Sequence, residues 1–136
     1  MRVLIADDEP VYQVLLQELF EAWGFEVVVA RDGNEAWELL QADPEIRMAT
    51  LDWMMPGMDG YQVCARAREQ ASRDLYILLI TGGARKQDLD RVLVVGADDY
   101  LLKPFEALDL KIRVRTAMRI MSLQDELNRR QTARTS

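Results

Sequence analysis

The chain has 136 residues, of which 49% are hydrophobic and 29% are charged, so it can bury the core of about one domain. It has no apolar run of the roughly 18 residues that a membrane span needs; a strand-like run at once after Met1 predicts no signal peptide, and the single cysteine, Cys64, favours a cytoplasmic protein. The net charge is -6 and histidine is absent, which excludes a Ser-His triad, a His-ligated zinc site and a phosphohistidine within the chain.

The first half of the chain predicts three strands and two helices. In chain order they are the strand 2–6, the helix 10–23, the buried strand 25–30, a short helix that contains residues 36–40 and ends near Asp43-Pro44, and the strand 48–51. Pro10 suits the first turn of a helix, and Gly24 supplies a left-handed residue where that helix ends. The third strand ends at Asp52 and is followed by a turn at Pro56-Gly57.

The second half continues the alternation. Its elements are the helix 60–67, the strand 76–80, the helix 88–95, the strand 99–102 and a helix from 106 to about 130. Strands that alternate with helices predict an α/β fold with a doubly wound parallel sheet, right-handed crossovers and helices on both faces. The last helix is too long for a minimal domain, so we expect an extended C-terminal helix.

Polar residues follow four of the predicted strands. They are Asp7 and Asp8 after the first strand, Asp52 after the third, Thr81 after the fourth and Lys103 after the fifth. The carboxyl ends of parallel strands share one edge of the sheet, and the strand order 2-1-3-4-5 would bring these side chains together. Taken alone, Asp52 has a simpler interpretation as a residue that caps its strand or the turn.

Three neighbouring carboxylates repel one another and raise one another's pKa unless a cation is present. Oxygen ligands without histidine or thiolate suit a hard ion such as Mg²⁺. With Mg²⁺ and Lys103 supplying positive charge, one carboxylate can attack a phosphoryl group and form an aspartyl phosphate. The hydroxyl of Thr81 can then donate a hydrogen bond to the new phosphoryl oxygens.

The motifs occur in the order and at the spacing of one known family, the receiver domain of two-component response regulators. They are Asp7-Asp8, LDWMMPGMDG around Asp52, Thr81-Gly82 and Lys103-Pro104-Phe105. The chain resembles this family over residues 1 to about 122. The resemblance implies a flavodoxin-like (βα)5 fold and a signalling switch of a phosphorelay, phosphorylated by a sensor histidine kinase or a phosphotransfer protein, rather than an enzyme that acts on other substrates.

The resemblance also assigns a metal site. Asp52 would be the phosphoacceptor, and Asp8 and Asp52 would bind Mg²⁺ directly. Asp7 would act through water, and the backbone carbonyl of Met54 would be a further ligand. In this family the residues at Met54 and Gly83 flank the path of the hydrolytic water, and neither side chain hydrogen-bonds water well, which predicts a long-lived aspartyl phosphate.

The remaining roles concern the response to phosphate. By the resemblance, Thr81 would contact the phosphoryl group, Lys103 would pair with it, and the Lys103-Pro104 peptide bond would be cis. Tyr100 matches the switch aromatic of the family, although its simpler interpretation is a half-buried residue of an edge strand. In the switch interpretation Thr81 moves toward the phosphate and Tyr100 fills the vacated space. This change would reshape the face of the fourth helix, fifth strand and fifth helix, which would control an output domain, a partner or a homodimer.

We expect the receiver domain to span residues 1–122 and a helical linker or tail to span 123–136. Residues 1–110 contain 10 basic and 21 acidic residues, whereas residues 111–136 contain 7 basic and 2 acidic residues. The acidic body argues against direct binding of nucleic acid by this domain. The basic tail is read either as a nucleic-acid arm or, more simply, as the solvated face of a helix.

The tail carries a short apolar stripe of Ile120, Leu123 and Leu127. It is read either as a few apolar residues on a solvated overhang or as the start of a two-stranded coiled-coil connector. By analogy, such a connector would lead to an output domain of the diguanylate cyclase or phosphatase type. We expect residues 131–136 to fray.

Three other functions compete with the signalling switch. A phosphohydrolase that resembles the haloacid dehalogenase type also uses a strand-end Asp with Mg²⁺. That family carries an Asp-x-Asp motif whose second Asp is the acid/base, and here the residue two positions after Asp52 is Met54. A nucleotide-binding domain needs a glycine-rich loop after the first strand, where this chain has acidic residues. A module that keeps only the fold would not need the set Asp8, Asp52, Thr81 and Lys103.

Overall fold

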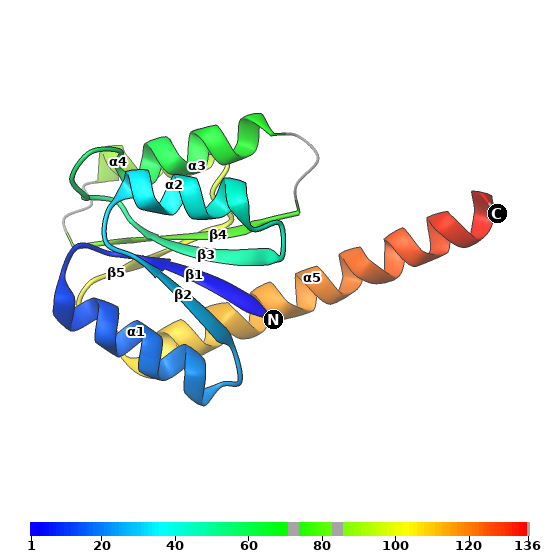
Figure 1. Cartoon of the computed structure of the whole chain (residues 1–136), viewed down its shortest axis with the longest axis horizontal. Coiled ribbons are helices and arrows are strands. Elements are labelled where there is room, and N and C mark those ends of the chain that lie inside the picture. The colour runs from blue at the N-terminus through cyan, green and yellow to red at the C-terminus, as the bar shows by residue number, and fades with distance from the viewer. Residues whose placement is uncertain (71–73, 83–85, 136) are drawn as a thin grey trace. The chain divides into compact units, whose positions relative to one another are not determined.

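The structure is a computed structural model that describes residues 1–70, 74–82 and 86–135, with the backbone alone at 86–89 and 135. In this part of the chain the strands are β1 (Arg2–Ala6), β2 (Glu26–Ala30), β3 (Ile46–Asp52), β4 (Tyr76–Thr81) and β5 (Asp99–Leu102). The helices that alternate with them are α1 (Pro10–Ala22), α2 (Gly33–Ala42), α3 (Gly60–Glu69), α4 (Lys86–Val95) and α5 (Ala107–Thr135) (Figure 1). The predicted alternation is confirmed.

The five strands form one parallel sheet in the order β2-β1-β3-β4-β5, as predicted. β2 lies on one side of β1, and β3 lies on the other, so the order of the strands switches between β1 and β3. Ligands of such sheets bind at this switch point. Ala6 pairs with Leu51, and Asp52 pairs with Ile80, so β1, β3 and β4 end side by side. This register places the residues that follow these strands at one edge.

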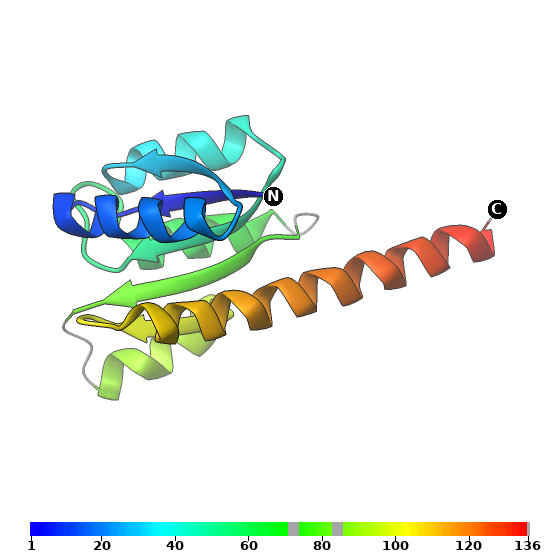
Figure 2. The same cartoon turned by 90° about the horizontal axis from the view of Figure 1, so that it is seen from below.

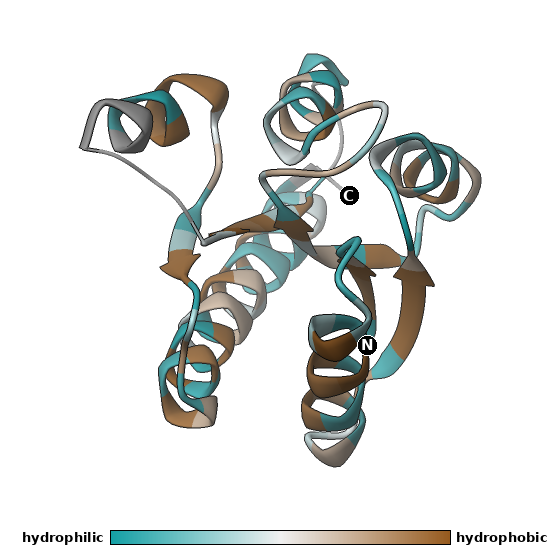
Figure 3. Ribbon diagram, turned by 90° about the vertical axis from the view of Figure 1, so that its left-hand side faces the viewer, coloured by the Kyte–Doolittle hydropathy of each residue, from teal (hydrophilic) through white to brown (hydrophobic). Residues whose placement is uncertain are grey.

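Helices cover both faces of the sheet: α2 and α3 lie on one face and α1 on the other (Figure 1). One hydrophobic core cluster joins the strand residues that face α2, α3 and α4. Its members from β1, β3 and β4 are Leu4, Ala6, Ile46, Ala49, Leu51, Ile77 and Leu79. Leu16 and Phe20 of α1 are buried as well. The strands are coloured mainly as hydrophobic in Figure 3, as expected for parallel strands buried on both faces.

Helix ends follow the sequence signals. Gly24 and Gly96 adopt φ values of 88° and 85°, which end α1 and α4 in the left-handed region. Asp59 and Gln62 form a capping box that begins α3. The Lys103-Pro104 peptide bond is cis, as the resemblance implied.

Two details of the sequence-based expectation were wrong. The strand β2 was expected to be buried, but Val27, Val28 and Val29 are only partly buried, because β2 is an edge strand with one neighbour. The helix α5 was expected to end near Arg130, but it continues to Thr135 as one unbroken helix (Figure 2), since no Gly or Pro interrupts it.

The chain divides into two compact units, Met1–Pro104 and Phe105–Ser136. The second unit contains α5, whose residues Leu110, Val114, Ala117 and Met121 are buried. None of the helices in the described ranges is both long enough and apolar enough to span a membrane.

Candidate functional site

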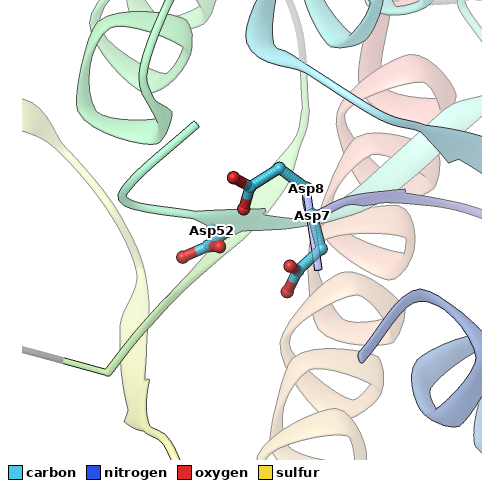
Figure 4. A group of neighbouring side chains, drawn as sticks. All are labelled: Asp7, Asp8 and Asp52. Carbon is cyan, nitrogen blue, oxygen red and sulfur yellow. The ribbon is translucent and has the colours of Figure 1, made fainter. Parts of the chain in front are cut away.

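Three carboxylates gather at the switch point of the sheet. One carboxylate oxygen from each of Asp7, Asp8 and Asp52 lies within 4.8 Å of the others, and Figure 4 shows the three side chains at the ends of β1 and β3 (Figure 4). Asp7 is 1% exposed and Asp52 is 4% exposed, whereas Asp8 is exposed. The structure thus brings together the three acidic residues that sequence reasoning selected.

The ammonium group of Lys103 lies against this cluster. Its Nζ atom is 2.8 Å from Asp7 Oδ2 and 3.3 Å from Asp52 Oδ2, and the Lys103 side chain is only 5% exposed. The backbone of Lys103 is held at the sheet edge, because its N–H donates to the carbonyl oxygen of Thr81 over 2.8 Å. Burial acts to lower the pKa of Lys103, but Asp7 and Asp52 outweigh it and raise that pKa above its usual value.

The environment of Asp52 disfavours a negative charge. Burial, and then the negative charge of Asp7, raise the pKa of Asp52 to about 7, against the opposing effect of Lys103 and a 3.4 Å hydrogen bond from the Met54 N–H. The single positive charge of Lys103 therefore does not balance the negative charges of the site. Its all-oxygen donor set fits a hard divalent cation such as Mg²⁺, which would favour the carboxylate form.

The loop after Asp52 closes tightly on the site. The N–H of Trp53 donates to the carbonyl oxygen of Ile80 over 2.9 Å, and the N–H of Gly60 donates to the carbonyl oxygen of Trp53 over 3.1 Å. A Cβ atom on Gly60 would collide with the carbonyl oxygen of Asp52, so a side chain there would displace the backbone of Asp52. The chain thus requires glycine at the start of α3 in order to hold Asp52 in place.

The other predicted residues occupy nearby positions on the sheet. Thr81 ends β4, next to β3, and is buried. Tyr100 lies on β5, pairs with Leu79 and packs half-buried against the core cluster. The Met54 side chain is 70% exposed, and Gly83 lies outside the residues that the structure describes.

Sequence reasoning missed Tyr12. The ring centroid of Tyr12 lies 4.1 Å from Lys103 Nζ, which is a cation–π contact. Glu9 also reaches Lys103, at 3.7 Å. The available signal was an aromatic residue in the first turn of a helix that begins directly after Asp7-Asp8.

A second aromatic group follows Asp52 directly. The rings of Trp53 and Tyr61 lie 5.7 Å apart, and the guanidinium of Arg91 in α4 lies 4.5 Å from the Tyr61 ring centroid and 5.8 Å from that of Trp53. The group connects α4 to the residue after Asp52. Nothing in the spacing of these three residues along the chain predicts the contact, because it depends on how α3 and α4 pack.

Comparison with known proteins agrees with this geometry. The sequence profile of the family described as Response regulator receiver domain matches residues 3–115. The transcriptional regulatory protein CpxR of Escherichia coli (strain K12) is 40% identical over 120 residues, which are 87% of this chain and 49% of CpxR.

Solved structures show the same fold. The receiver domain of the Francisella response regulator 1452 matches with a TM-score of 0.81 and 31% identity over 88% of this chain and 98% of that chain. A "probable two-component system response regulator/GGDEF domain protein" matches with a TM-score of 0.83 and 28% identity over 90% of this chain and 50% of that chain. The chain spans about half the length of the curated relatives it matches.

Proposed function

The chain belongs to the response regulator receiver domain family, and on this premise we propose that it is a phosphorylation-dependent switch that accepts a phosphoryl group on Asp52. One observation carries the proposal. The buried carboxylate of Asp52 lies 3.3 Å from the ammonium of Lys103, and its oxygen lies within 4.8 Å of those of Asp7 and Asp8. The proposed nucleophile thus lies beside a buried cation and the acidic pair that would bind the metal ion.

In the proposed transfer, a carboxylate oxygen of Asp52 attacks the phosphorus atom of a phosphohistidine on a sensor kinase or phosphotransfer protein. A P–O bond forms, the P–N bond breaks, and the electron pair of that bond stays on the imidazole nitrogen. The ammonium of Lys103 pairs with the phosphoryl oxygens, and the hydroxyl of Thr81 donates a hydrogen bond to them. The chain catalyses only its own phosphorylation and dephosphorylation.

The carboxylates supply the metal site of this proposal. Asp8 and Asp52 would hold Mg²⁺ directly, Asp7 would act through water, and the carbonyl of Met54 would complete the protein ligands. When bound, Mg²⁺ neutralises the charge that the carboxylates and the phosphoryl group bring together. The raised pKa of Asp52 supports this part of the proposal, because Asp52 needs additional positive charge nearby to remain ionised at neutral pH.

The response to phosphate would pass through Thr81 and Tyr100 to the surface of α4 and β5. This surface carries apolar side chains that a partner or a second copy of the chain could bury: Leu93 is 79% exposed, Val94 is 82% exposed and Leu102 is 45% exposed. A crystal structure with beryllofluoride should show a changed Tyr100 rotamer and a shifted α4. An unchanged rotamer together with an unchanged α4 would contradict this switch.

An output domain outside the receiver domain is a further part of the proposal. The chain covers about half of relatives that are described as transcriptional regulators, and half of a structure whose description includes a GGDEF domain. We propose a cytoplasmic protein whose output domain, of the diguanylate cyclase or phosphatase type by analogy, follows α5. The length of the intact gene product tests this directly, and a product that ends at Ser136 would contradict it.

Incubation with acetyl phosphate and Mg²⁺, followed by intact mass measurement, tests the phosphoacceptor. The wild type should gain a single phosphoryl group, and Asp52→Asn should gain none. Asp59→Asn is the matched control, because Asp59 lies outside the site and asparagine caps a helix as well as aspartate. A wild type without an adduct, an adduct on Asp52→Asn, or steady hydrolysis of a phosphomonoester would each overturn the proposal.

A further inference from the structure

The ring of Tyr12 forms one wall around the ammonium group of Lys103. The side chain of Lys103 is 5% exposed, and its Nζ atom lies 4.1 Å from the ring centroid of Tyr12. On its other sides are Asp7 Oδ2 at 2.8 Å and Asp52 Oδ2 at 3.3 Å. Glu9, at 3.7 Å, is 56% exposed and is a weaker partner because solvent screens it.

The position of this ring is fixed by the first turn of α1. The N–H of Glu9 donates to Asp7 Oδ1 over 2.9 Å, and the side-chain amide of Gln13 donates to the backbone carbonyl oxygen of Asp7. The N–H of Gln13 also donates to the carbonyl oxygen of Glu9 over 3.0 Å. Tyr12 lies inside this hydrogen-bonded turn, so its ring is held relative to the same Asp7 that binds Lys103.

The contact has a physical consequence for the ammonium group. The face of an aromatic ring carries partial negative charge and attracts a cation more strongly when water is excluded. The ring therefore stabilises the charged group, and it occupies the side of Lys103 from which water would otherwise compete with the carboxylates. An aliphatic side chain of similar size would exclude water without attracting the charge.

We propose that Tyr12 is a positioning residue that holds the Lys103 ammonium beside the Asp52 carboxylate, where the charge of the incoming phosphoryl group is neutralised. This inference rests on the proposed function of Asp52 and deepens it by assigning a role to α1. Tyr12 acts through its contact with Lys103.

A nuclear magnetic resonance experiment tests the contact itself. The chain has three lysines, Lys86, Lys103 and Lys111, so a sample labelled with ¹³C at the lysine ε-carbon gives three signals. An aromatic ring shields nuclei that lie over its face, so the Lys103 signal should be shifted upfield in the wild type. Tyr12→Phe should retain this shift, and Tyr12→Leu should lose it while the other two signals stay unchanged.

The rate of phosphorylation by acetyl phosphate tests the role. We expect Tyr12→Leu to lower the rate constant about three- to thirtyfold, with the Mg²⁺ concentration for half-maximal rate unchanged. Tyr12→Phe keeps the ring face and should recover most of the rate. Val11→Ala is the control for the same turn of α1, because Val11 is 76% exposed.

The outcomes separate the two proposals. If the wild type is phosphorylated and Tyr12→Leu reacts at the wild-type rate, the role of Tyr12 is wrong and Asp52 remains the acceptor. A Tyr12→Phe rate as low as that of Tyr12→Leu would also overturn the role, since the ring face would not matter. If the wild type takes up no phosphoryl group, the proposed function and the role both fail, although the Lys103 signal still reports the contact.

Discussion

The surroundings of Asp52 disfavour the ionised form of its carboxyl group. Its carboxyl group is 4% exposed, and burial with the charge of Asp7 raises its pKa from the ordinary 3.8 to about 7. The folded state therefore binds a proton at Asp52 more tightly than the unfolded state does. Between about pH 4 and pH 7 the contribution of this group to the free energy of unfolding falls as pH rises, and the full cost is present above pH 7.

Replacing Asp52 by asparagine should therefore stabilise the fold in metal-free buffer at high pH. We expect Asp52→Asn to have a higher free energy of unfolding than the wild type at pH 8, by on the order of 2 kcal/mol, with the difference shrinking toward pH 4. Urea unfolding with a chelator present, at several pH values, measures it. A difference that stays constant with pH would contradict the burial argument, and Mg²⁺ should narrow the gap at pH 8.

The buried hydroxyl of Thr50 also lowers the free energy of unfolding, for a different reason. It lies on β3, is 1% exposed, and its Oγ1 atom has no hydrogen-bond partner among the residues that the structure describes. Valine has nearly the same shape without the hydroxyl, so Thr50→Val should raise the free energy of unfolding by about 1 kcal/mol. Thr116→Val is the exposed control and should change it by less than about 0.5 kcal/mol. Chemical denaturation checks both variants, and a destabilised Thr50→Val would show that the hydroxyl has a partner in solution.

At the scale of elements, one arginine joins three of them. Arg68, near the end of α3, donates to the carbonyl oxygens of Gly96 at 2.7 Å and Leu75 at 2.6 Å, and to Asp98 Oδ2 at 2.6 Å. Asp98 in turn accepts from the N–H of Ile77 over 2.8 Å. The guanidinium thus ties the end of α3 to the turn after α4 and to the start of β4.

The Arg68 fork is this set of contacts to Gly96, Leu75 and Asp98. Removing it should destabilise the side of the sheet that contains β4 and β5. We expect Arg68→Ala to lower the free energy of unfolding by about 2 kcal/mol, and Arg68→Lys to recover only part of it because a lysine cannot satisfy three acceptors in one plane. Arg66→Ala is the matched control, since Arg66 lies on the same helix and is exposed. Equal losses for the Arg66 and Arg68 variants in denaturant titrations would argue that the loss of any arginine from this helix, and not the fork, is responsible.

At the scale of the whole molecule, burial ends well before the chain does. Among the side chains of α5 that the structure describes, Met121 is the last buried one, and those after it are exposed or partly exposed. The apolar side chains of Leu123 and Leu127 are 59% and 57% exposed. This distribution supports the proposed division into a receiver domain at 1–122 and a tail at 123–136, and it leaves the tail's apolar stripe available for a helical partner.

A chain that ends at Ser122 should therefore fold with nearly full stability. We expect its free energy of unfolding to be within about 1 kcal/mol of that of the full chain, because none of the side chains described after Ser122, at 123–134, is buried. A chain that ends at Asp109 loses four buried apolar residues and should lose several kcal/mol or fail to fold. Thermal unfolding of the three chains, at equal concentration, makes the comparison. Loss of stability already at Ser122 would move the domain boundary into the tail.

The fold and the composition of the site could be predicted because they depend on local patterns. Apolar runs, glycine stops and a proline at the start of α1 give the order of elements, and a sheet built from alternating strands and helices has few arrangements. Once the strands are parallel, residues that directly follow them share one edge. The gathering of Asp7, Asp8, Asp52, Thr81 and Lys103 at that edge follows from their positions after strands.

The sequence by itself thus determined the alternation of strands and helices and which side chains follow the strands, because both depend on short-range periodicity; the strand order was then the one that brings those side chains together. Only the tertiary structure decided how they meet. The ring of Tyr12 over Lys103, the pKa of Asp52 and the fork of Arg68 each depend on distances of a few ångströms between residues far apart in the chain. Such distances are set by the packing of whole helices against the sheet, which no local pattern specifies.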